Sequence, residues 1–255
     1  MTDLTAWRVE WLRLWRSHRL LALLAVFAFL GFSEPLAARY LPDLLRGSTG
    51  SRLTVTAVAP AVPADGVGGY ASNSLQLGLV VVVVVAAFAC TIDSRPALTV
   101  FYRTRVRSFA ALLIPRAVVT ACGAIAAYLV GLAAAWYETA VLIGGPDAGA
   151  MAASALLGSV YLAFAVVVTA AAGAFARSSL GTVGYALVVL LLLPLVGAIP
   201  RLGSWLPSAL VRAPDALVRH SATAGHYQYA VVSAVLSGAV LLLAGCRVGA
   251  RRETG

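Results

Sequence analysis

The chain has 255 residues, of which 61% are hydrophobic and only 11% are charged, and its mean hydropathy is +0.90. Because soluble domains carry about 25% charged and 45–50% apolar residues, this composition excludes a disordered chain and argues against a soluble enzyme. The formal charge is nevertheless +9, from 19 basic and 10 acidic side chains. The charge must therefore be confined to particular parts of the chain.

All 19 basic residues are arginine. A Walker A loop and a Schiff-base enzyme both need a lysine, so this chain can carry neither site. The bias toward Ala, Val, Leu and Arg without lysine is typical of a GC-rich bacterial genome. Cys90, Cys122 and Cys246 are scattered through apolar runs with no CxxC pair, which favours small buried side chains over a disulfide framework or a zinc site.

Residues 3–18 are predicted to form an amphipathic helix. Glu10, Arg13 and Arg16 fall on one face, and the opposite stripe is apolar and rich in tryptophan. That stripe consists of Leu4, Trp7, Trp11, Leu14, Trp15 and His18. Because an indole has an apolar body and a polar tip, we expect this helix to lie in the membrane interface. Packing against a soluble partner is the alternative.

Six membrane spans are predicted, because about 20 apolar residues in a helix cross a hydrocarbon core of ~30 Å. They lie at about residues 20–40, 72–92, 109–135, 150–176, 179–199 and 228–247. The first span must run through Glu34 and Pro35, since the uncharged run 20–33 is too short to cross. A cleaved signal peptide is the alternative for residues 1–40, although Ser33-Glu34-Pro35 is a poor cleavage site.

The arginines are divided unequally between the two sides of this six-span arrangement. Thirteen lie on the side with both termini and the 93–108 connection, and six lie on the other. The positive-inside rule therefore predicts that both termini are cytoplasmic in a bacterial inner membrane. All of the excess positive charge is on that side, so we interpret it as a topology signal that does not call for nucleic acid.

The 93–108 connection is predicted to form a short cytoplasmic helix. Its apolar face consists of Leu98, Phe101 and Tyr102. The basic end that follows consists of Arg103, Arg105 and Arg107. Such a helix either docks on a cytoplasmic partner or rests on anionic lipid.

Two other segments lie outside the predicted spans. Residues 200–227 are too apolar for a free loop, and we predict one or two short external helices that dip back into the outer leaflet. Residues 41–71 are rich in Gly and Pro, a composition that predicts an extended external loop.

Ionisable residues within spans are candidates for function. Glu34, with Pro35 and Arg39 nearby, is the best candidate for a residue in a substrate path, and the alternative is an interfacial carboxylate that reaches the outer headgroups. Arg116 is expected to extend its charge toward the inner headgroups. No Gly-x-Ser-Gly stands in a span, and the three histidines include only one close pair. An intramembrane protease or zinc enzyme is therefore disfavoured.

Three local motifs accompany this order of elements. They are Trp7-Arg8-Val9-Glu10-Trp11-Leu12-Arg13 before the first span, Leu113-Ile114-Pro115-Arg116 after the Arg-rich link 101–107, and Ala176-Arg177-Ser178-Ser179-Leu180-Gly181 between spans four and five. With these motifs and this order, the whole chain resembles an ABC-2-type permease, the membrane subunit of a bacterial ABC exporter. One departure is the long first external loop, to which the resemblance assigns no role.

The resemblance implies a single all-α domain in which 3–18 is the elbow helix and 96–106, within the 93–108 connection, is the coupling helix that docks on an ATPase. The implied coupling residues are Leu98, Phe101, Tyr102, Arg103 and Arg105. ATP and Mg would bind to separate ATPase subunits and no cofactor to this chain. A second copy or a related permease would complete the transport unit in the lipid bilayer.

The expected substrate is hydrophobic or amphipathic. Its path is expected to follow apolar walls near Tyr128, Tyr161 and Tyr185, with Glu34 as a further candidate. The competing interpretation is a non-transporting polytopic membrane protein, such as an immunity or assembly factor.

Overall fold

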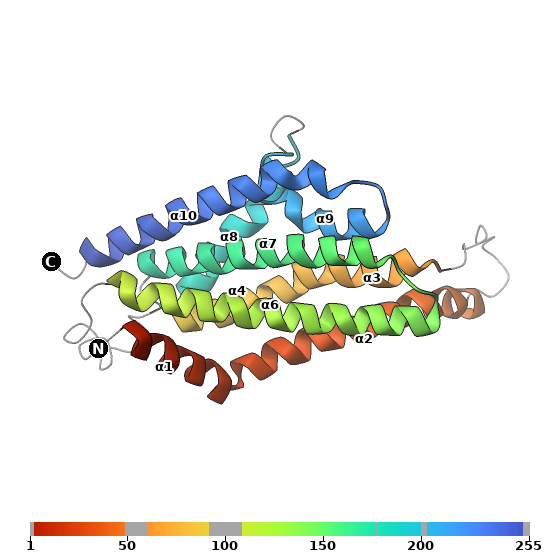
Figure 1. Ribbon diagram of the computed structural model, residues 1–255, viewed down its shortest axis with the longest axis horizontal. Helices are drawn as coiled ribbons and strands as arrows, with labels where there is room; N and C mark the ends of the chain where they lie inside the picture. Colours follow the sequence, from red (N-terminus) through yellow and green to blue (C-terminus); the bar gives the residue numbers. More distant parts are fainter. Residues whose placement is uncertain (1–2, 49–60, 92–108, 177, 200–202, 252–255) are drawn as a thin grey trace.

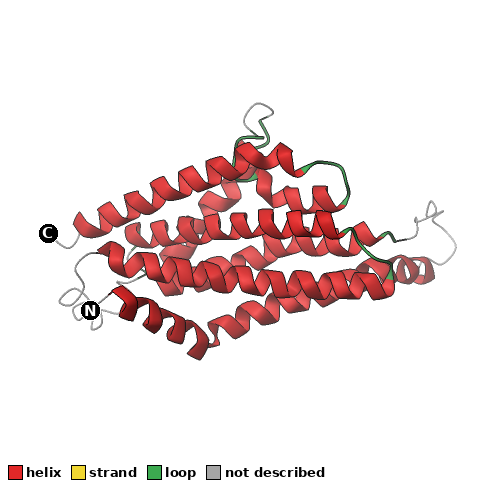
Figure 2. Ribbon diagram, viewed as in Figure 1, coloured by secondary structure: helices red, strands yellow, loops and turns green. Residues whose placement is uncertain are grey.

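The computed structural model of the chain describes residues 3–48, 61–91, 109–176, 178–199 and 203–251. All regular elements in these ranges are helical (Figure 1, Figure 2). Six helical segments within them are long and apolar enough to cross a membrane: His18–Leu44, Pro63–Cys90, Phe109–Leu142, Ala148–Phe175, Ser179–Val196 and Ala224–Arg251. The prediction of an all-α polytopic membrane protein with six spans is confirmed.

The helices follow one another up and down the bundle, as expected for consecutive membrane spans. In chain order they are α1 (Asp3–Arg16), α2 (His18–Ser48), α3 (Pro63–Asn73), η1 (Ser74–Gly78), α4 (Leu79–Cys90), α6 (Phe109–Leu142), α7 (Ala148–Phe175), α8 (Ser179–Val196), α9 (Ala209–Val218), η2 (Ala224–Tyr227) and α10 (Gln228–Arg251). The π-helical η1 joins α3 to α4, so these three elements form the second span. The first residues of α1 and the last of α10 lie at one end of the bundle (Figure 1), which we call the N/C end; the opposite end is the far end.

The structure corrects the predicted external loop 41–71 at both of its ends, and residues 49–60 of that loop lie outside the described residues. Helix α2 continues through Pro35 and Pro42 to Ser48, and α3 already begins at Pro63. Proline fits the first turn of a helix, where its missing N–H has no intrahelical acceptor. Gly66, Gly68 and Gly69, which suggested a loop, are instead helical residues that let neighbouring elements approach closely.

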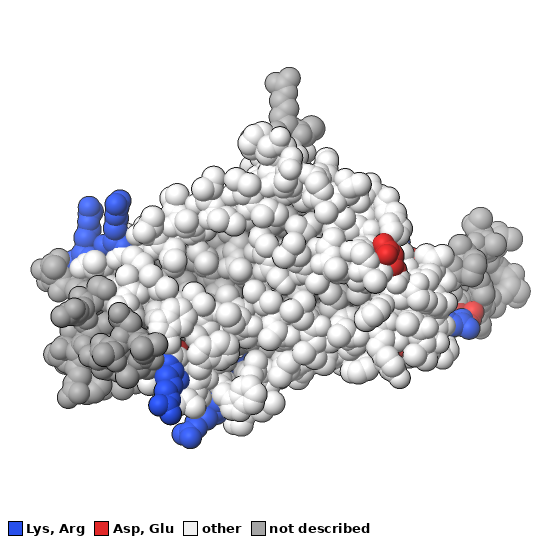
Figure 3. Space-filling model, viewed as in Figure 1, with Lys and Arg blue, Asp and Glu red and all other residues white. Residues whose placement is uncertain are grey.

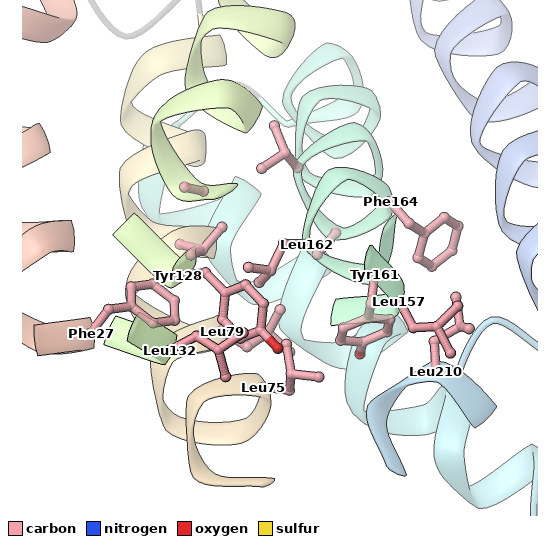
Figure 4. Close-up of a cluster of buried hydrophobic side chains, with 14 of the residues drawn as sticks. Phe27, Leu75, Leu79, Tyr128, Leu132, Leu157, Tyr161, Leu162, Phe164 and Leu210 are labelled. Atoms are coloured by element: carbon pink, nitrogen blue, oxygen red, sulfur yellow. The ribbon is translucent and has the colours of Figure 1, made fainter. Parts of the chain in front are cut away.

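The interior of the bundle depends on close helix crossings. Helix α2 packs along α6, and Gly31 and Gly131 each face the backbone of the opposite helix. A Cβ on Gly131 would collide with the Phe27 carbonyl oxygen, and a Cβ on Gly31 would collide with the Gly131 carbonyl oxygen. Helix α7 contacts α4, α6, α8, α9 and α10. Phe27, Tyr128 and Tyr161 therefore belong to one buried cluster that extends across the bundle (Figure 4).

The outward faces of α2, α8 and α10 are apolar and exposed. They carry, among others, Leu21, Phe29, Leu180, Tyr185, Leu191, Leu195, Val235, Leu236 and Leu243. On the face drawn in Figure 3, the arginine atoms gather mainly at the N/C end and the broad middle is uncharged. This pattern is what a bilayer around the bundle requires, because lipid tails solvate apolar side chains and exclude charges.

Asp147 caps the N-terminus of α7 in the short turn after α6. Its two carboxylate oxygens accept hydrogen bonds from the backbone N–H groups of Gly149 (3.0 Å) and Ala150 (3.1 Å), and these bonds hold the pKa of Asp147 below its usual range. A carboxylate with a lowered pKa stabilises the fold above the unfolded-state pKa of about 4, and this contribution is lost as the pH falls through the folded-state value.

Asp147→Ala is therefore expected to lower the apparent melting temperature of the detergent-solubilised protein at pH 7, because two backbone donors lose their acceptor. Asp147→Asn, which keeps one acceptor oxygen, should lose less. The gap between wild type and Asp147→Ala should narrow when the melting curves are repeated near pH 3. A gap that is equally wide at both pH values would contradict the charged cap.

Candidate functional site

A buried ion pair joins α1 to α6 at the N/C end. The Arg116 guanidinium donates from Nε to Glu10 Oε1 at 3.0 Å, and the two side chains are only 4% and 13% exposed. Arg13 lies 3.7 Å from the same carboxylate oxygen and is one-third exposed. We call Glu10, Arg13 and Arg116 the basal junction. A buried charge is tolerated only where a partner compensates for its lost hydration, so Glu10 and Arg116 depend on each other.

The basal junction corrects the orientation expected for the first helix. The sequence placed Glu10 on the face turned away from the apolar stripe and predicted that Arg116 reaches toward headgroups. Instead, Glu10 is turned toward α6 and accepts from Arg116, whereas Arg16 stays exposed. Leu14 completes the contact and is buried against Gly123, where an added Cβ would lie 2.9 Å from a Leu14 methyl carbon. The sequence signal was an arginine inside an apolar run, which needs a partner.

The three tryptophans predicted to lie at the interface differ in exposure. Trp7 is half-buried, whereas Trp11 and Trp15 are 47% and 76% exposed. The exposed pair lies on the side of α1 that does not pack against α6. A free surface of this composition is consistent with a helix at the membrane interface.

The predicted coupling residues Leu98, Phe101, Tyr102, Arg103 and Arg105 lie outside the described residues. The elements on either side of that connection are described: α4 ends at Cys90 and α6 begins at Phe109. Both of these ends lie at the N/C end, the same end as α1 (Figure 1). Any force applied at the connection therefore enters the bundle beside the basal junction.

A chain of buried hydrogen bonds links four helices within the core. The Tyr70 hydroxyl donates to the Tyr128 carbonyl oxygen (2.6 Å), the Tyr128 hydroxyl to the Ser154 carbonyl oxygen (3.4 Å), and the Ser154 hydroxyl to the Pro214 carbonyl oxygen (3.0 Å). The Tyr70 and Tyr128 rings stack with centroids 5.8 Å apart, and Phe27 meets Tyr128 edge-on at 6.1 Å. This chain ties α3, α6 and α7 to the external helix α9.

The three tyrosines predicted to line one path are not brought together on one surface. Tyr128 and Tyr161 are buried in the same core cluster, and Tyr161 packs 6.5 Å from the Phe164 ring (Figure 4). Tyr185 lies on the outward face of α8 and is 63% exposed. In this conformation, the first two are packing residues and the third faces the surroundings of the bundle.

Glu34 forms a polar contact between the first two spans. It accepts a 2.6 Å hydrogen bond from the Asn73 side chain, and Gly69 leaves the space that its carboxylate occupies. Arg39, the partner considered from the sequence, lies 3.6 Å from Asp43 instead. Asn73 is the last residue before η1, and π-helical turns are rare and frequently occur at functional sites. No composition signal in the sequence predicts this turn.

The described part of segment 200–227, which was predicted to be external, folds back on the bundle at the far end. Its described part contains α9 and η2, as the prediction of one or two short helices expected. Helix α9 buries Leu210 and Leu217 and contacts α3 and α7. Arg219 donates to Asp65 and to Asp215, each at 2.9 Å, and these two bonds raise its pKa.

The site thus consists of polar contacts that hold helices to one another, at the N/C end, in the core and at the far end. Within the described ranges, no group of three His, Cys, Asp or Glu side chains could hold a metal ion. The arrangement is suited to transmitting movement between helices. When the chain is compared with protein-family models and with curated proteins, no match is found.

Proposed function

We propose that this protein is the membrane subunit of a bacterial ABC exporter of the ABC-2 type. The observation that carries the proposal is the basal junction: α1 is held to α6 at the same end of the bundle where the Arg-rich connection leaves α4 and enters α6. The resemblance in element order supports the same assignment. The proposal places the N/C end in the cytoplasm, in agreement with the positive-inside rule.

In this proposal, separate ATPase subunits bind ATP and Mg and dock on the 93–108 connection. Their closure moves the connection, and α6 moves with it because its first residue directly follows the connection. Helix α1 must follow α6, since separating Arg116 from Glu10 would break a buried hydrogen bond between two charged groups. The spans then exchange between inward-open and outward-open states according to which state the nucleotide favours.

A second permease copy or a related chain would cover part of the exposed apolar surface of α2, α8 and α10. A hydrophobic or amphipathic substrate would pass between the two halves. Tyr128 and Tyr161 are packed inside one subunit in this conformation, so the proposal assigns the path to surfaces such as that of Tyr185 on α8.

The double variant Phe101→Ala with Arg105→Ala tests the docking surface. It should insert into the membrane at the wild-type level but retain little ATPase subunit when the tagged chain is purified. The matched control removes the same residue types at the far end, where Arg39 and the aromatic Tyr40 are exposed. Arg39→Ala with Tyr40→Ala should retain the ATPase fully. Equal retention by the two double variants would refute the coupling-helix assignment.

A further inference from the structure

A groove lies at the corner where α1 turns into α2. It has a volume of about 370 Å³ and is lined by Val9, Leu12, Arg13, Arg16 and Ser17. The corner forms one edge of the bundle near the N/C end (Figure 1). It lies beside the contact with α6, since Arg13 lines the groove and is also 3.7 Å from Glu10.

One wall of the groove is apolar and exposed. Val9 and Leu12 are 49% and 46% exposed, and Trp11 and Trp15 extend this surface along α1. In the first turn of α2, Leu21 is 62% exposed and begins the apolar surface that faces lipid. The groove therefore opens next to the start of the exposed apolar surface of α2.

The other wall is cationic. Arg13 and Arg16 line the groove, and Arg8 is exposed on the preceding turns of α1. The Glu10 carboxylate does not effectively neutralise the positive charge of this wall. It is turned inward to Arg116 at 3.0 Å, and its distance to Arg13 is longer, at 3.7 Å. The Ser17 hydroxyl donates to the Leu14 carbonyl oxygen, so its oxygen remains able to accept a hydrogen bond from a ligand.

We propose that this groove binds an anionic phospholipid. The Arg13 and Arg16 guanidinium groups would hold the lipid phosphate, since their planar donor sets match phosphate oxygens. An acyl chain would lie along Val9 and Leu12, and a headgroup hydroxyl could donate to Ser17. Cationic and apolar walls complement such a lipid, which carries negative charge and hydrocarbon together. This proposal does not depend on the transport function.

The test is native mass spectrometry of the purified chain in nonionic detergent. The chain is titrated with phosphatidylglycerol and with phosphatidylcholine of identical acyl chains. Wild type should retain phosphatidylglycerol selectively. Arg13→Gln with Arg16→Gln should lower its retention by about 25-fold, at about 5-fold for each arginine near an anionic surface. Arg16→Gln alone should lower phosphatidylglycerol retention by about 5-fold, the loss expected for one arginine. This single variant leaves Arg13 in place beside Glu10.

The matched control is Arg247→Gln with Arg251→Gln, which removes two arginines from α10 at the same end of the bundle. It should bind phosphatidylglycerol like wild type. Equal losses in the two double variants, or equal retention of the two lipids by wild type, would overturn the proposal.

Two further results would assign the groove to another occupant and also overturn the proposal. Displacement of the lipid by millimolar inorganic phosphate would show a site for a free anion. Unchanged lipid retention in Arg13→Gln with Arg16→Gln, together with loss of a co-purified ATPase, would show a protein-docking surface.

Discussion

Gly131→Ala is expected to cause a large loss of stability. A Cβ at this position would collide with the backbone carbonyl oxygen of Phe27 and would lie close to the Tyr70 hydroxyl. A side chain can rotate away from a new methyl group, but the backbone of a packed helix cannot, so α2 and α6 must move apart. Overpacking of this kind costs about 1–3 kcal/mol or more. The apparent melting temperature should fall by roughly 5–10 °C.

Gly184→Ala is the matched control for this change. It adds the same methyl group to another membrane helix, at a position with nothing within 4 Å of the new Cβ. Since alanine has the higher helix propensity, this variant should melt at or slightly above the wild-type temperature. If the two glycine variants melted at the same temperature in detergent, the close crossing of α2 and α6 would be wrong.

Glu10→Gln is expected to detach α1 from the bundle and to lower the apparent melting temperature as severely as Gly131→Ala. The change is nearly isosteric, but it removes the carboxylate charge to which the buried Arg116 guanidinium donates. Removing one partner of a buried pair costs about 3–5 kcal/mol. A protease site can be inserted between α1 and α2. Faster cleavage at this site in Glu10→Gln than in wild type would report the detachment independently of the melting curve.

Two variants separate the loss of the ion pair from the loss of any charge at this position. Arg13→Gln removes only the 3.7 Å contact to Glu10 on a partly exposed side chain, and it should change the melting temperature little, as surface pairs do. Glu10→Arg combined with Arg116→Glu reverses the pair and should recover part of the loss. A Glu10→Gln variant as stable as Arg13→Gln would show that the buried pair contributes nothing.

The number and type of the spans could be predicted because composition alone decides them. The run from Leu79 to Ala89 is apolar on every side, and a backbone in lipid can satisfy its hydrogen bonds locally only as a helix. The ends of the spans were less predictable. Pro35 was expected inside the first span, whereas Pro42 and Pro63 suggested a loop, yet Pro42 also lies inside α2 and Pro63 starts α3.

The interhelical contacts could not be predicted, because each depends on residues far apart in the chain. Arg219 and Asp65 are separated by 154 residues and appear in the sequence as two unrelated external charges. Glu10 looked solvent-facing because an apolar tryptophan stripe occupies the other side of the same helix. In α1, however, Trp11 and Trp15 of the apolar stripe stay exposed and Glu10 turns inward to a buried arginine, which reverses the rule for soluble helices.

The most direct test of the proposed function is ATP hydrolysis by the assembled complex. The neighbouring reading frames are searched for an ATPase with a Walker A loop, and this candidate is co-expressed with the chain and reconstituted with it in liposomes. The account predicts that the two proteins co-purify and that vanadate-sensitive hydrolysis rises severalfold above that of the ATPase alone. A chain that purifies by itself as a stable protein and leaves the hydrolysis rate unchanged would contradict the exporter assignment and favour a non-transporting membrane protein.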